Sequence, residues 1–368
     1  MGLFRRFNLL SFLFVILSAL EANAQMEVVK TPFSWLNVRN DKRYIEDHTK
    51  DLTIRFFGTN KFSGYVIGHN GNAEKLPYSS NDYVNLGLGF SWRFIGMNLG
   101  FKIPFQDNDR FGRTKTFDLQ SFLYFRKLQL DIYAQAHNGL HVSQPGKLYR
   151  LEEENVFPYR EDMRTRNFGV NGQYIFNNRR FSYRAAFLQN EYQKKSAGSF
   201  MLGGSLYYFR AAGDSAIIPS DVIYGAPFWR ENFDRTNVIS LSVNAGYAYT
   251  LVLYRHFFIT GSIAAGPGIN YTNRRGGSPD RMDAGIDYQL NGTLRVAVGY
   301  NSPEYFAGLQ YIRLTNRNGM AAPAGWQQFE TGSLRVTLAR RIKLNKKMES
   351  RVLKAIEDVA DEVEEVIR

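Results

Sequence analysis

The sequence predicts an all-β protein, a transmembrane antiparallel up-and-down β-barrel, and three observations carry the prediction. The 368-residue chain contains 29 Phe, 22 Tyr, 4 Trp and 32 Gly but no Cys, a composition that suits many strands and disfavours helical bundles and disordered chains. Hydrophobic residues alternate with polar ones over long runs. Short turns flanked by aromatic residues also alternate with longer polar connections.

The N-terminal residues 1–24 have the pattern of a secretory signal peptide. Two arginines precede an apolar run from Leu9 to Leu20, and small residues at 22–24 would suit a signal peptidase. The apolar run has about 12 residues, whereas a membrane-spanning helix needs about 20. We therefore expect export, cleavage before Gln25, and a periplasmic N-terminal segment over residues 25–50.

The remainder of the chain has hydrophobic residues with a period of two. From Met282 to Tyr300 the even positions are mainly large and apolar, while the odd positions are polar or small. Similar alternation occurs over 84–92, 95–103 and 128–136. A tilted membrane strand needs about 9–11 residues, and sandwich strands usually have about five or six. The length of these runs favours a membrane barrel.

The pattern predicts thirteen strands between residues 51 and 342. They cover 51–68, 82–93, 95–106, 115–126, 127–138, 165–177, 181–193, 199–210, 237–253, 256–271, 281–300, 304–316 and 327–342. A single-chain barrel with both ends on one side needs an even number, so one strand is either missing or spurious. If all short turns are periplasmic, a further crossing or a lumen plug lies within 211–236. Fourteen strands is the first prediction and twelve the alternative.

The turns and loops predict the orientation of this barrel. Aromatic residues flank five short turns: Trp92 and Phe94, Phe125, Phe176 and Phe181, Tyr254 and Phe257, and Tyr300 and Tyr305. Such aromatic girdles are typical of the periplasmic edge of a membrane barrel. Longer polar connections are expected at 106–114, 141–164, 272–280 and 317–325 on the opposite, extracellular side.

The C-terminal residues 345–368 depart from the strand pattern. Apolar residues recur every three or four positions, from Met348 to Ile367, with charged residues between them. This spacing predicts an amphipathic helix. We expect the helix in the periplasm, packed on the barrel rim or against a periplasmic partner.

The sequence contains no recognisable catalytic or metal-binding motif. His137 and His141 are four residues apart, but they follow a strand, where that spacing does not pair two ligands. Ser121 and His137 lie at unequal distances from the Arg126–Lys127 turn, which argues against a hydrolase pair. We therefore expect no metal, no cofactor and no enzymatic activity.

The polar faces of the strands predict which residues line the lumen. The candidates combine acids, bases and amides: Lys102, Asp118, Gln120, Tyr124, Gln129, Asp131, Tyr133, Gln135, Arg184, Asp283, Asp287, Gln289, Arg295 and Arg335. In an open pore, such mixed charges would select small polar solutes by charge and size. In a compact barrel, the same residues would fill the lumen with hydrogen bonds.

The formal net charge of +12 permits acidic partners. Export and the absence of a basic helix argue against nucleic acid. Lys194 and Lys195 at one predicted extracellular tip, and Arg274 and Arg275 at another, suit lipopolysaccharide phosphates. Outer-membrane lipid and lipopolysaccharide are therefore the expected partners.

Three segments resemble a family of Bacteroidota outer-membrane proteins that has no assigned function. They are NLGLGFSWRFIGMNLGFKIPF (85–105), RFGRTKTFDLQS (110–121) and RRFSYRAAFLQNEYQKKSAGSF (179–200). The resemblance covers most of the mature chain. It implies an outer-membrane location and brings no catalytic residues. For a barrel in that membrane we also expect the barrel-assembly machinery as a partner.

These observations predict an outer-membrane barrel that is either a non-enzymatic conduit for small polar solutes or a structural envelope protein. Two alternatives remain at this point. One is a lipid-processing outer-membrane barrel enzyme, and the other is a soluble periplasmic β-sandwich that binds a ligand.

Overall fold

The computed structural model describes residues 38–69, 75–81, 84–92, 95–103, 111–144, 157–219, 233–276, 281–320 and 325–344. The predicted signal peptide and the predicted C-terminal helix at 345–368 lie outside these residues. The first elements are β1 (Ile45–Asp47), β2 (Leu52–His69), β3 (Lys75–Ser79), β4 (Val84–Trp92), β5 (Ile95–Lys102), β6 (Lys115–Tyr124), β7 (Leu128–Val142) and β8 (Tyr159–Ile175). They are followed by α2 (Tyr183–Phe187), β9 (Glu191–Gln193), β10 (Ala197–Ala212), β11 (Phe233–Leu253), β12 (Phe257–Gly276), β13 (Arg281–Asn301), β14 (Tyr305–Met320) and β15 (Gly325–Ile342).

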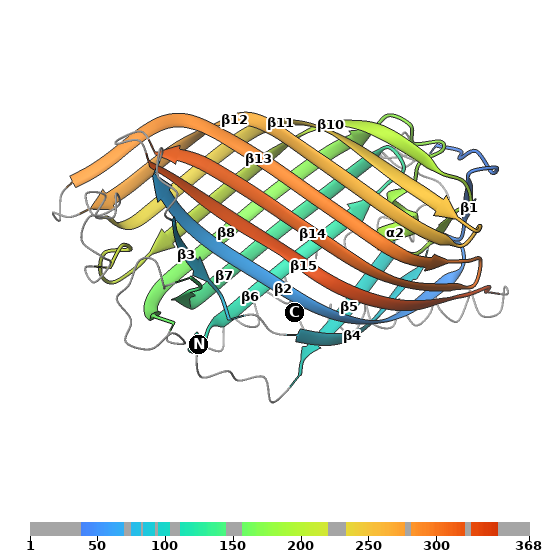
Figure 1. Ribbon diagram of the computed structural model, residues 1–368, viewed down its shortest axis with the longest axis horizontal. Helices are drawn as coiled ribbons and strands as arrows, with labels where there is room; N and C mark the ends of the chain where they lie inside the picture. Colours follow the sequence, from blue (N-terminus) through green and yellow to red (C-terminus); the bar gives the residue numbers. More distant parts are fainter. Residues whose placement is uncertain are drawn as a thin grey trace, which may run out of the picture.

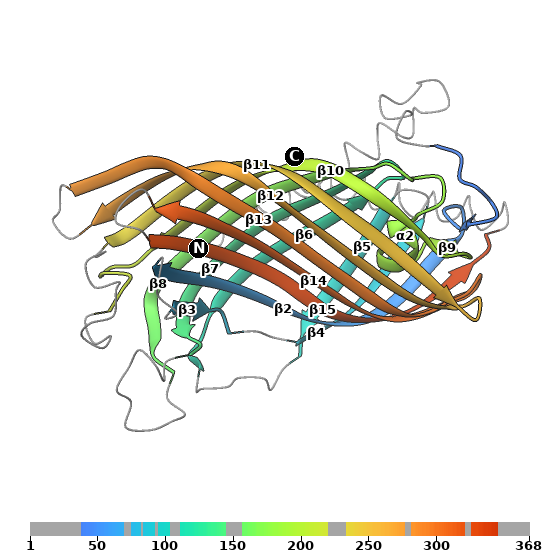
Figure 2. The ribbon, with the colours of Figure 1, turned by 45° about the horizontal axis from the view of Figure 1, so that its top comes forward.

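The long strands form one antiparallel sheet that closes on itself (Figures 1 and 2). The described ring runs β15-β14-β13-β12-β11-β10-β8-β7-β3-β2, and β2 pairs with β15 to complete it. Three further strands lie outside this ring path, because β4 pairs with β2, β5 with β4, and β6 with β7. The prediction of an all-β antiparallel barrel is confirmed, and the alternative of two facing sheets is wrong.

The short strand β3 joins the two sides of the ring. It pairs with β2 from Gly64 to Gly68, beyond the stretch of β2 that pairs with β4. On its other side it pairs with β7 at only two positions, Tyr78 with Val142 and Ser79 with His141. This strand was missed in the sequence, where Pro77 interrupts a short run that has no long alternation.

The first prediction of fourteen strands is not supported by the described sheet. Twelve of the thirteen predicted strands are present, but residues 181–193 do not form a strand of the barrel wall. Without that strand, β10 runs from the turn-bearing end of the barrel toward the opposite end, which is the reverse of the predicted direction. It pairs with β11 along its whole length, from Ala197 to Ala212. β10 and β11 are therefore direct neighbours, with no further wall strand between them.

Residues 181–193 instead turn inward as α2 and β9. Ser182 caps α2, its side-chain oxygen accepting a hydrogen bond from the backbone N–H of Ala185 at 3.1 Å. Gln189 has a φ of 60°, so the chain reverses immediately after α2. In a wall strand, Arg184 and Glu191 would have opposite parity, and one of the two charges would face lipid at a cost of about 2–4 kcal/mol near the bilayer centre.

The two ends of the barrel differ in their connections. Turns at 125–127, 254–256 and 302–304 define one end, called here the turn end, where β1 and α2 also lie (Figure 1). The opposite, loop end carries the β7–β8 and β10–β11 connections. Lys194 and Lys195 lie at the turn end, where Lys195 stands over the ring of Tyr44, so their predicted place at an extracellular tip is wrong.

Several strands extend further toward the loop end than predicted. β12 continues to Gly276 and β14 to Met320, which leaves connections of four residues at 277–280 and 321–324. The predicted loops at 272–280 and 317–325 are therefore mostly strand. These residues were predicted as loops because they are polar. A strand that extends past the apolar band of the barrel surface can be polar on both faces.

Alternation places apolar side chains on the outside of the barrel and polar ones inside. On β12 and β13 the outward residues Ile263, Ile269, Ile286 and Leu290 are each more than half exposed. The inward Ser262, Asn270 and Asn291 are buried. This arrangement inverts that of a water-soluble protein, because the apolar surface faces outward.

Two aromatic residues depart from the predicted girdle at the turn end. Phe176, Tyr254, Phe257 and Tyr305 are exposed on the outside, as expected. Phe181, however, is buried in the lumen, and Trp92 is buried with its indole N–H donating to the Lys50 carbonyl at 3.2 Å.

A close backbone approach on β12 leads to a stability prediction. A Cβ on Gly266 would lie 1.8 Å from the Val243 carbonyl oxygen, whereas a Cβ on Gly261 would meet nothing within 4 Å. Gly266→Ala should lower the free energy of unfolding by about 1–3 kcal/mol, because the backbone of β11 must shift. Urea unfolding in lipid vesicles, followed by tryptophan fluorescence, measures this. Gly261→Ala is the matched control, and equal midpoints for both variants would contradict the close approach.

Candidate functional site

The inward face of β7 carries most of the predicted lumen residues. Five alternating side chains of this strand are buried: Gln129, Asp131, Tyr133, Gln135 and His137. Their neighbours on β8, Asn167, Asn171 and Gln173, are buried as well. The lumen at this level is therefore packed with polar side chains that do not reach water.

An ion pair between β7 and β13 crosses the middle of the lumen. The Arg295 guanidinium donates to the Asp131 carboxylate, and both side chains are fully buried. Strands β8, β10, β11 and β12 lie between β7 and β13 on one side, and β14, β15 and β2 lie beyond β13 on the other, so this pair joins two walls that are not neighbours in the sheet. The pair therefore occupies part of the lumen cross-section.

The remaining contacts of this ion pair hold it in place. Gln129 and Asn171 each donate an amide N–H to Asp131 Oδ2, at 2.9 and 3.0 Å. Arg295 also donates to the Tyr124 hydroxyl at 3.1 Å. Buried charges are tolerated when they are paired and hydrogen-bonded, and these contacts give each charge a partner. Asp131 Oδ1 and Arg295 Nε are buried without a hydrogen-bond partner among the described atoms.

A network of amides and hydroxyls continues from this pair toward the loop end. Asn244 donates to Asn171 Oδ1 at 3.1 Å, and Asn291 donates to Ser205 Oγ at 2.8 Å. Gln135 donates to Thr331 Oγ1 at 2.9 Å from the other side of the ring. A cavity beside this network, lined by His137, Thr165 and Phe329 among others, has a volume of about 10 Å³, barely space for one water molecule.

Apolar side chains close the loop end above this network. Ile217 and Ile218, which follow β10, are buried against the inward residues of several strands. The Tyr78 hydroxyl donates to the Ile217 carbonyl at 2.5 Å, which joins β3 to this segment.

At the turn end, residues 181–193 fold into the lumen and are called here the inturned segment. Both ribbon views place α2 between the walls (Figures 1 and 2). The Tyr183 hydroxyl bonds the Ser262 hydroxyl of β12, and Gln310 of β14 donates to the Ala186 carbonyl at 2.7 Å. Phe181 and Phe187 pack in the same apolar cluster as Phe258. The segment fills the lumen rather than extending the wall.

Glu191 is the buried charge that anchors the inturned segment. Its side chain is fully buried, and its carboxylate lies 3.0 Å from the Arg126 guanidinium and 3.4 Å from that of Arg184. The Ser182 hydroxyl donates to its second oxygen at 2.6 Å. Arg184, predicted to line the lumen from a strand, therefore does so from α2.

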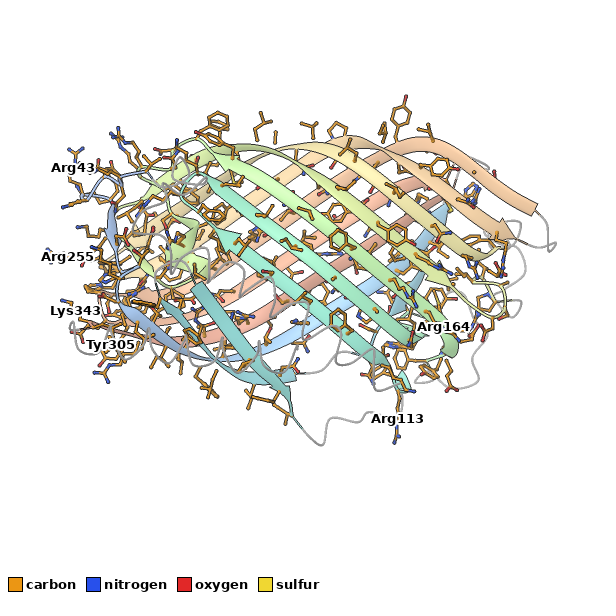
Figure 3. The ribbon with its side chains drawn as sticks, turned by 180° about the vertical axis from the view of Figure 1, so that it is seen from behind. Arg43, Arg113, Arg164, Arg255, Tyr305 and Lys343 are labelled. Atoms are coloured by element: carbon orange, nitrogen blue, oxygen red, sulfur yellow. The ribbon has the colours of Figure 1, made fainter. Side chains whose placement is uncertain are left out.

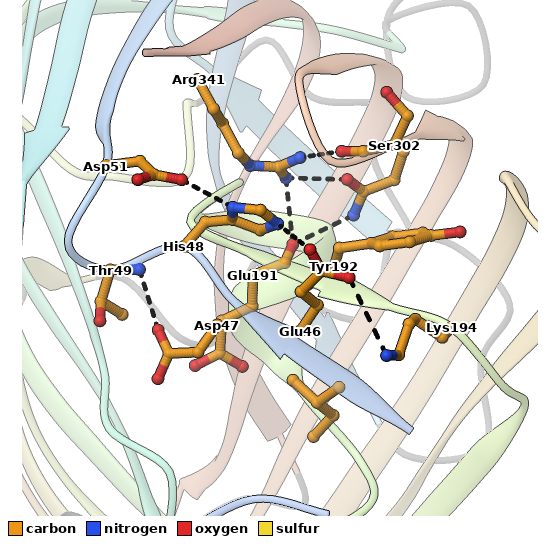
Figure 4. Close-up of polar contacts among 12 residues, drawn as sticks. Glu46, Asp47, His48, Thr49, Asp51, Glu191, Tyr192, Lys194, Ser302 and Arg341 are labelled. Carbon is orange, nitrogen blue, oxygen red and sulfur yellow. Dashed lines mark hydrogen bonds and ion pairs between the residues drawn. The ribbon is translucent and has the colours of Figure 1, made fainter. Parts of the chain in front are cut away.

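Arg341 of β15 completes this cluster at the mouth of the barrel (Figure 4). Its guanidinium donates to the carbonyl oxygens of Gln189 at 2.7 Å and Glu191 at 3.0 Å, and also to that of Ser302. The N-terminal strand β1 pairs antiparallel with β9 beside it. The turn end is thus closed by three parts of the chain that are distant in sequence.

Carboxylates of the N-terminal segment add charge around this closure. Burial would raise the pKa of Asp47, but hydrogen bonds from Thr49 and the guanidinium groups of Arg126 and Arg184 outweigh it, so this pKa lies below its ordinary value. The partly exposed Asp41 has a pKa of about 2 because the Arg43 guanidinium donates hydrogen bonds to its carboxylate. Since both folded pKa values are lowered, these contacts stabilise the fold above the ordinary aspartate pKa, and the effect is lost as the pH falls through the lowered values.

The other predicted lumen residues lie at the edges of the packed region. Asp118 is 3.6 Å from the Lys61 ammonium and accepts from Gln120 at 3.2 Å. Arg335 is partly buried over the Phe57 ring at 4.6 Å. Gln289 is buried and Asp287 is partly buried on β13, whereas Asp283 is half-exposed and accepts from Arg274 at 2.6 Å. The side chain of Lys102 lies outside the described set.

Sequence reasoning missed Glu191, Arg126 and Arg341. Arg126 was read as part of a turn and Arg341 as the end of the last strand, because their partner lies in a segment taken for wall. The sequence of residues 181–193 does contain an indication of this. Arg184 is at an even position and Glu191 at an odd one, so a wall strand would place one of the two charges against lipid.

The chemistry of this interior is that of a closed core. Within the described ranges no group of three or more His, Asp or Glu side chains is placed to hold a metal ion, and no helix there is long and apolar enough to span a membrane. His137 lies opposite Thr116, and Ser121 lies opposite Ile132. Ser121 and His137 are therefore not brought together.

Several solved structures of barrels are similar to this chain. The toluene transporter TodX of P. putida is 8% identical, with 80% of this chain and 91% of that chain covered and a TM-score of 0.26. The translocator domain of the autotransporter NalP from Neisseria meningitidis is 8% identical, with 89% and 97% covered and a TM-score of 0.29. OmpT, an outer membrane protein of Vibrio cholerae, in a loop-deletion form, is 11% identical, with 78% and 99% covered and a TM-score of 0.24. No curated protein matches the sequence.

The Glu191 cluster leads to a prediction about the inturned segment. Glu191→Gln leaves Arg126 and Arg184 near a neutral side chain, so the free energy of unfolding should fall by about 3–5 kcal/mol. Urea unfolding in vesicles measures the loss. Asp41→Asn, which removes a carboxylate from an exposed pair at the same end, should shift the midpoint little. Equal small shifts for both variants would contradict an anchoring role for Glu191.

A family model provides the remaining comparison. It is described as Domain of unknown function (DUF4421), and it matches residues 39–332, which span the barrel from before β1 into β15. The match covers most of the chain, and it includes both the inturned segment and the central ion pair. The chain therefore belongs to the DUF4421 family.

Proposed function

We propose that this protein is an outer-membrane β-barrel that acts as a structural, non-enzymatic component of the envelope rather than as an open conduit. The observation that carries the proposal is the fully buried Arg295–Asp131 pair across the lumen. The inturned segment closes the same lumen independently at the turn end. Withdrawing that segment alone would leave the central ion pair in the path of a solute.

The outer surface supports the membrane location. Outward side chains such as Leu88, Phe200, Val243 and Ile286 are between three-fifths and three-quarters exposed. Such an extensive apolar surface is rare on water-soluble proteins and is expected of a barrel in lipid. Exposed aromatics occur toward both ends, including Tyr254 at the turn end and Tyr288 nearer the loop end, which resembles the two interfacial girdles of membrane barrels.

Export supports the outer membrane as the compartment. The predicted signal peptide at 1–24 directs the chain out of the cytoplasm, and β-barrels span outer membranes. The barrel-assembly machinery is then the expected partner for insertion, and the predicted C-terminal helix would face the periplasm, where it has room for a protein partner. A phosphate-bearing lipid is the expected ligand of the outer surface.

Conductance tests the closed lumen directly. The mature full-length chain, inserted in a planar bilayer, should show no stable unitary conductance steps, because the Arg295–Asp131 pair and the inturned segment both occupy the lumen. An open porin inserted in the same bilayer serves as the positive control. Reproducible steps from the wild-type chain would overturn the structural proposal and favour the conduit.

A double-mutant cycle tests the central pair. Arg295→Met and Asp131→Leu should each lower the free energy of unfolding by about 3–5 kcal/mol, because each leaves an unpaired buried charge. The double variant should be more stable than either single variant. The exposed Arg313–Glu330 pair, with atoms 2.6 Å apart, provides the control cycle, whose coupling should be about 1 kcal/mol or less. Additive losses at residues 131 and 295 would show that the two charges do not interact.

A further inference from the structure

Four arginines gather on the outer surface of the barrel at the loop end. They lie on the adjacent strands β8, β10 and β11, and they are Arg164, Arg166, Arg210 and Arg235. All four have the outward parity, which they share with the exposed Phe168, Leu206 and Ile239. Figure 3 shows this side of the barrel and labels Arg164.

The strand register brings these arginines into two adjacent rows. Arg166 lies directly opposite Arg210, while Arg164 and Arg235 flank Ala212 from its two sides. Like charges directly opposite each other on a sheet are destabilising. The arrangement therefore costs stability unless an anion lies among the guanidinium groups.

Among the residues that the structure describes, two carboxylates line the cavity beside these four arginines. They belong to Asp162 and Asp214, and the cavity has a volume of about 110 Å³. Arg160 binds Asp162 through two nitrogens, each 2.8 Å from a carboxylate oxygen, and Asp214 is 3.8 Å from Arg164. Arg235 Nε is buried without a hydrogen-bond partner among the described atoms. Positive charge thus exceeds negative charge at a recessed place on the surface.

An apolar surface begins immediately below the arginines. Two residues further along the strands, toward the turn end, the outward-facing row consists of Phe168, Tyr208 and Ile239. The next outward row is Val170, Leu206 and Leu241. An amphiphile could therefore place an anionic group at the arginines while its chains lie along the strands.

We propose that Arg164, Arg166, Arg210 and Arg235 form a binding site for the phosphate headgroup of a membrane lipid, whose acyl chains lie against Phe168, Leu206 and Ile239. Guanidinium groups bind phosphate oxygens through paired, charge-assisted hydrogen bonds. A phosphate among the four would also relieve the repulsion between Arg166 and Arg210. The inference rests on the proposed function in one respect, that the apolar surface faces a bilayer.

Lipid binding to the purified full-length barrel tests this site. Native mass spectrometry in detergent compares dioleoylphosphatidic acid, which has a phosphate monoester, with dioleoylphosphatidylcholine, which has the same acyl chains and no net charge. The wild-type chain should bind phosphatidic acid at least about tenfold more tightly. Inorganic phosphate at the same concentration should not displace it, because phosphate alone lacks the chains.

Variants then locate the bound lipid. Arg166→Gln combined with Arg210→Gln should weaken phosphatidic acid binding about tenfold or more. The matched control combines Arg313→Gln and Arg317→Gln, two outward arginines that already have protein partners, Glu330 at 2.6 Å and the Trp326 ring at 3.9 Å. The control should bind within about twofold of the wild type. If the test variant does not fold, as judged by its heat-dependent gel mobility, Arg210→Gln alone carries the test.

Three results would overturn the proposal. These are wild-type affinity in the Arg166 and Arg210 variants, equal binding of the two lipids, and displacement by inorganic phosphate alone. Failure of the closed-lumen proposal has a different readout, since conductance would appear in the bilayer while lipid binding stayed as measured. The two ideas can therefore fail separately.

Discussion

Closure of the sheet is the constraint on which the rest of this structure depends. Once β15 pairs with β2, every wall residue must face either the outside or the lumen, and the backbone groups of the long strands bond those of their neighbours. The ring is narrow enough for Arg295 on one wall to reach Asp131 on the opposite wall. The lumen is consequently a core, and polar side chains fill it because the apolar ones are needed outside.

Arginine side chains occur in three different environments in this barrel. In the centre, Arg295 is paired with a carboxylate and excluded from water. At the turn end, Arg341 binds mainly backbone carbonyl oxygens, so it satisfies the polar groups of a chain that leaves the wall. On the outside, Arg166 and Arg210 face each other without a described carboxylate partner. The central arginine is neutralised by its carboxylate and adds no net charge, whereas Arg166 and Arg210 contribute positive charge that faces the surroundings.

Most wall strands could be predicted because alternation is a local property of the chain. β13 is an example, since the period from Met282 to Tyr300 identifies both its faces without knowledge of its partners. The inturned segment could not be predicted in this way. Its aromatics resemble those of a strand, and its conformation depends on contacts such as Gln310 with the Ala186 carbonyl, which joins residues 124 positions apart. The same limit applies to the site: the strand pattern indicated that Asp131 and Arg295 face inward, but not that they meet.

The junction through β3 has a consequence for the mechanics of the wall. Neighbouring long strands share ladders of many residue pairs, as β10 and β11 do along sixteen positions, whereas β3 meets β7 at two. Separating two neighbouring strands requires breaking only the hydrogen bonds between them. A closed sheet therefore opens most easily between the two strands that share the fewest residue pairs. Under load or in denaturant, the described ring would part between β3 and β7 first, and the cylinder would then unroll as a single curved sheet with its other pairings intact.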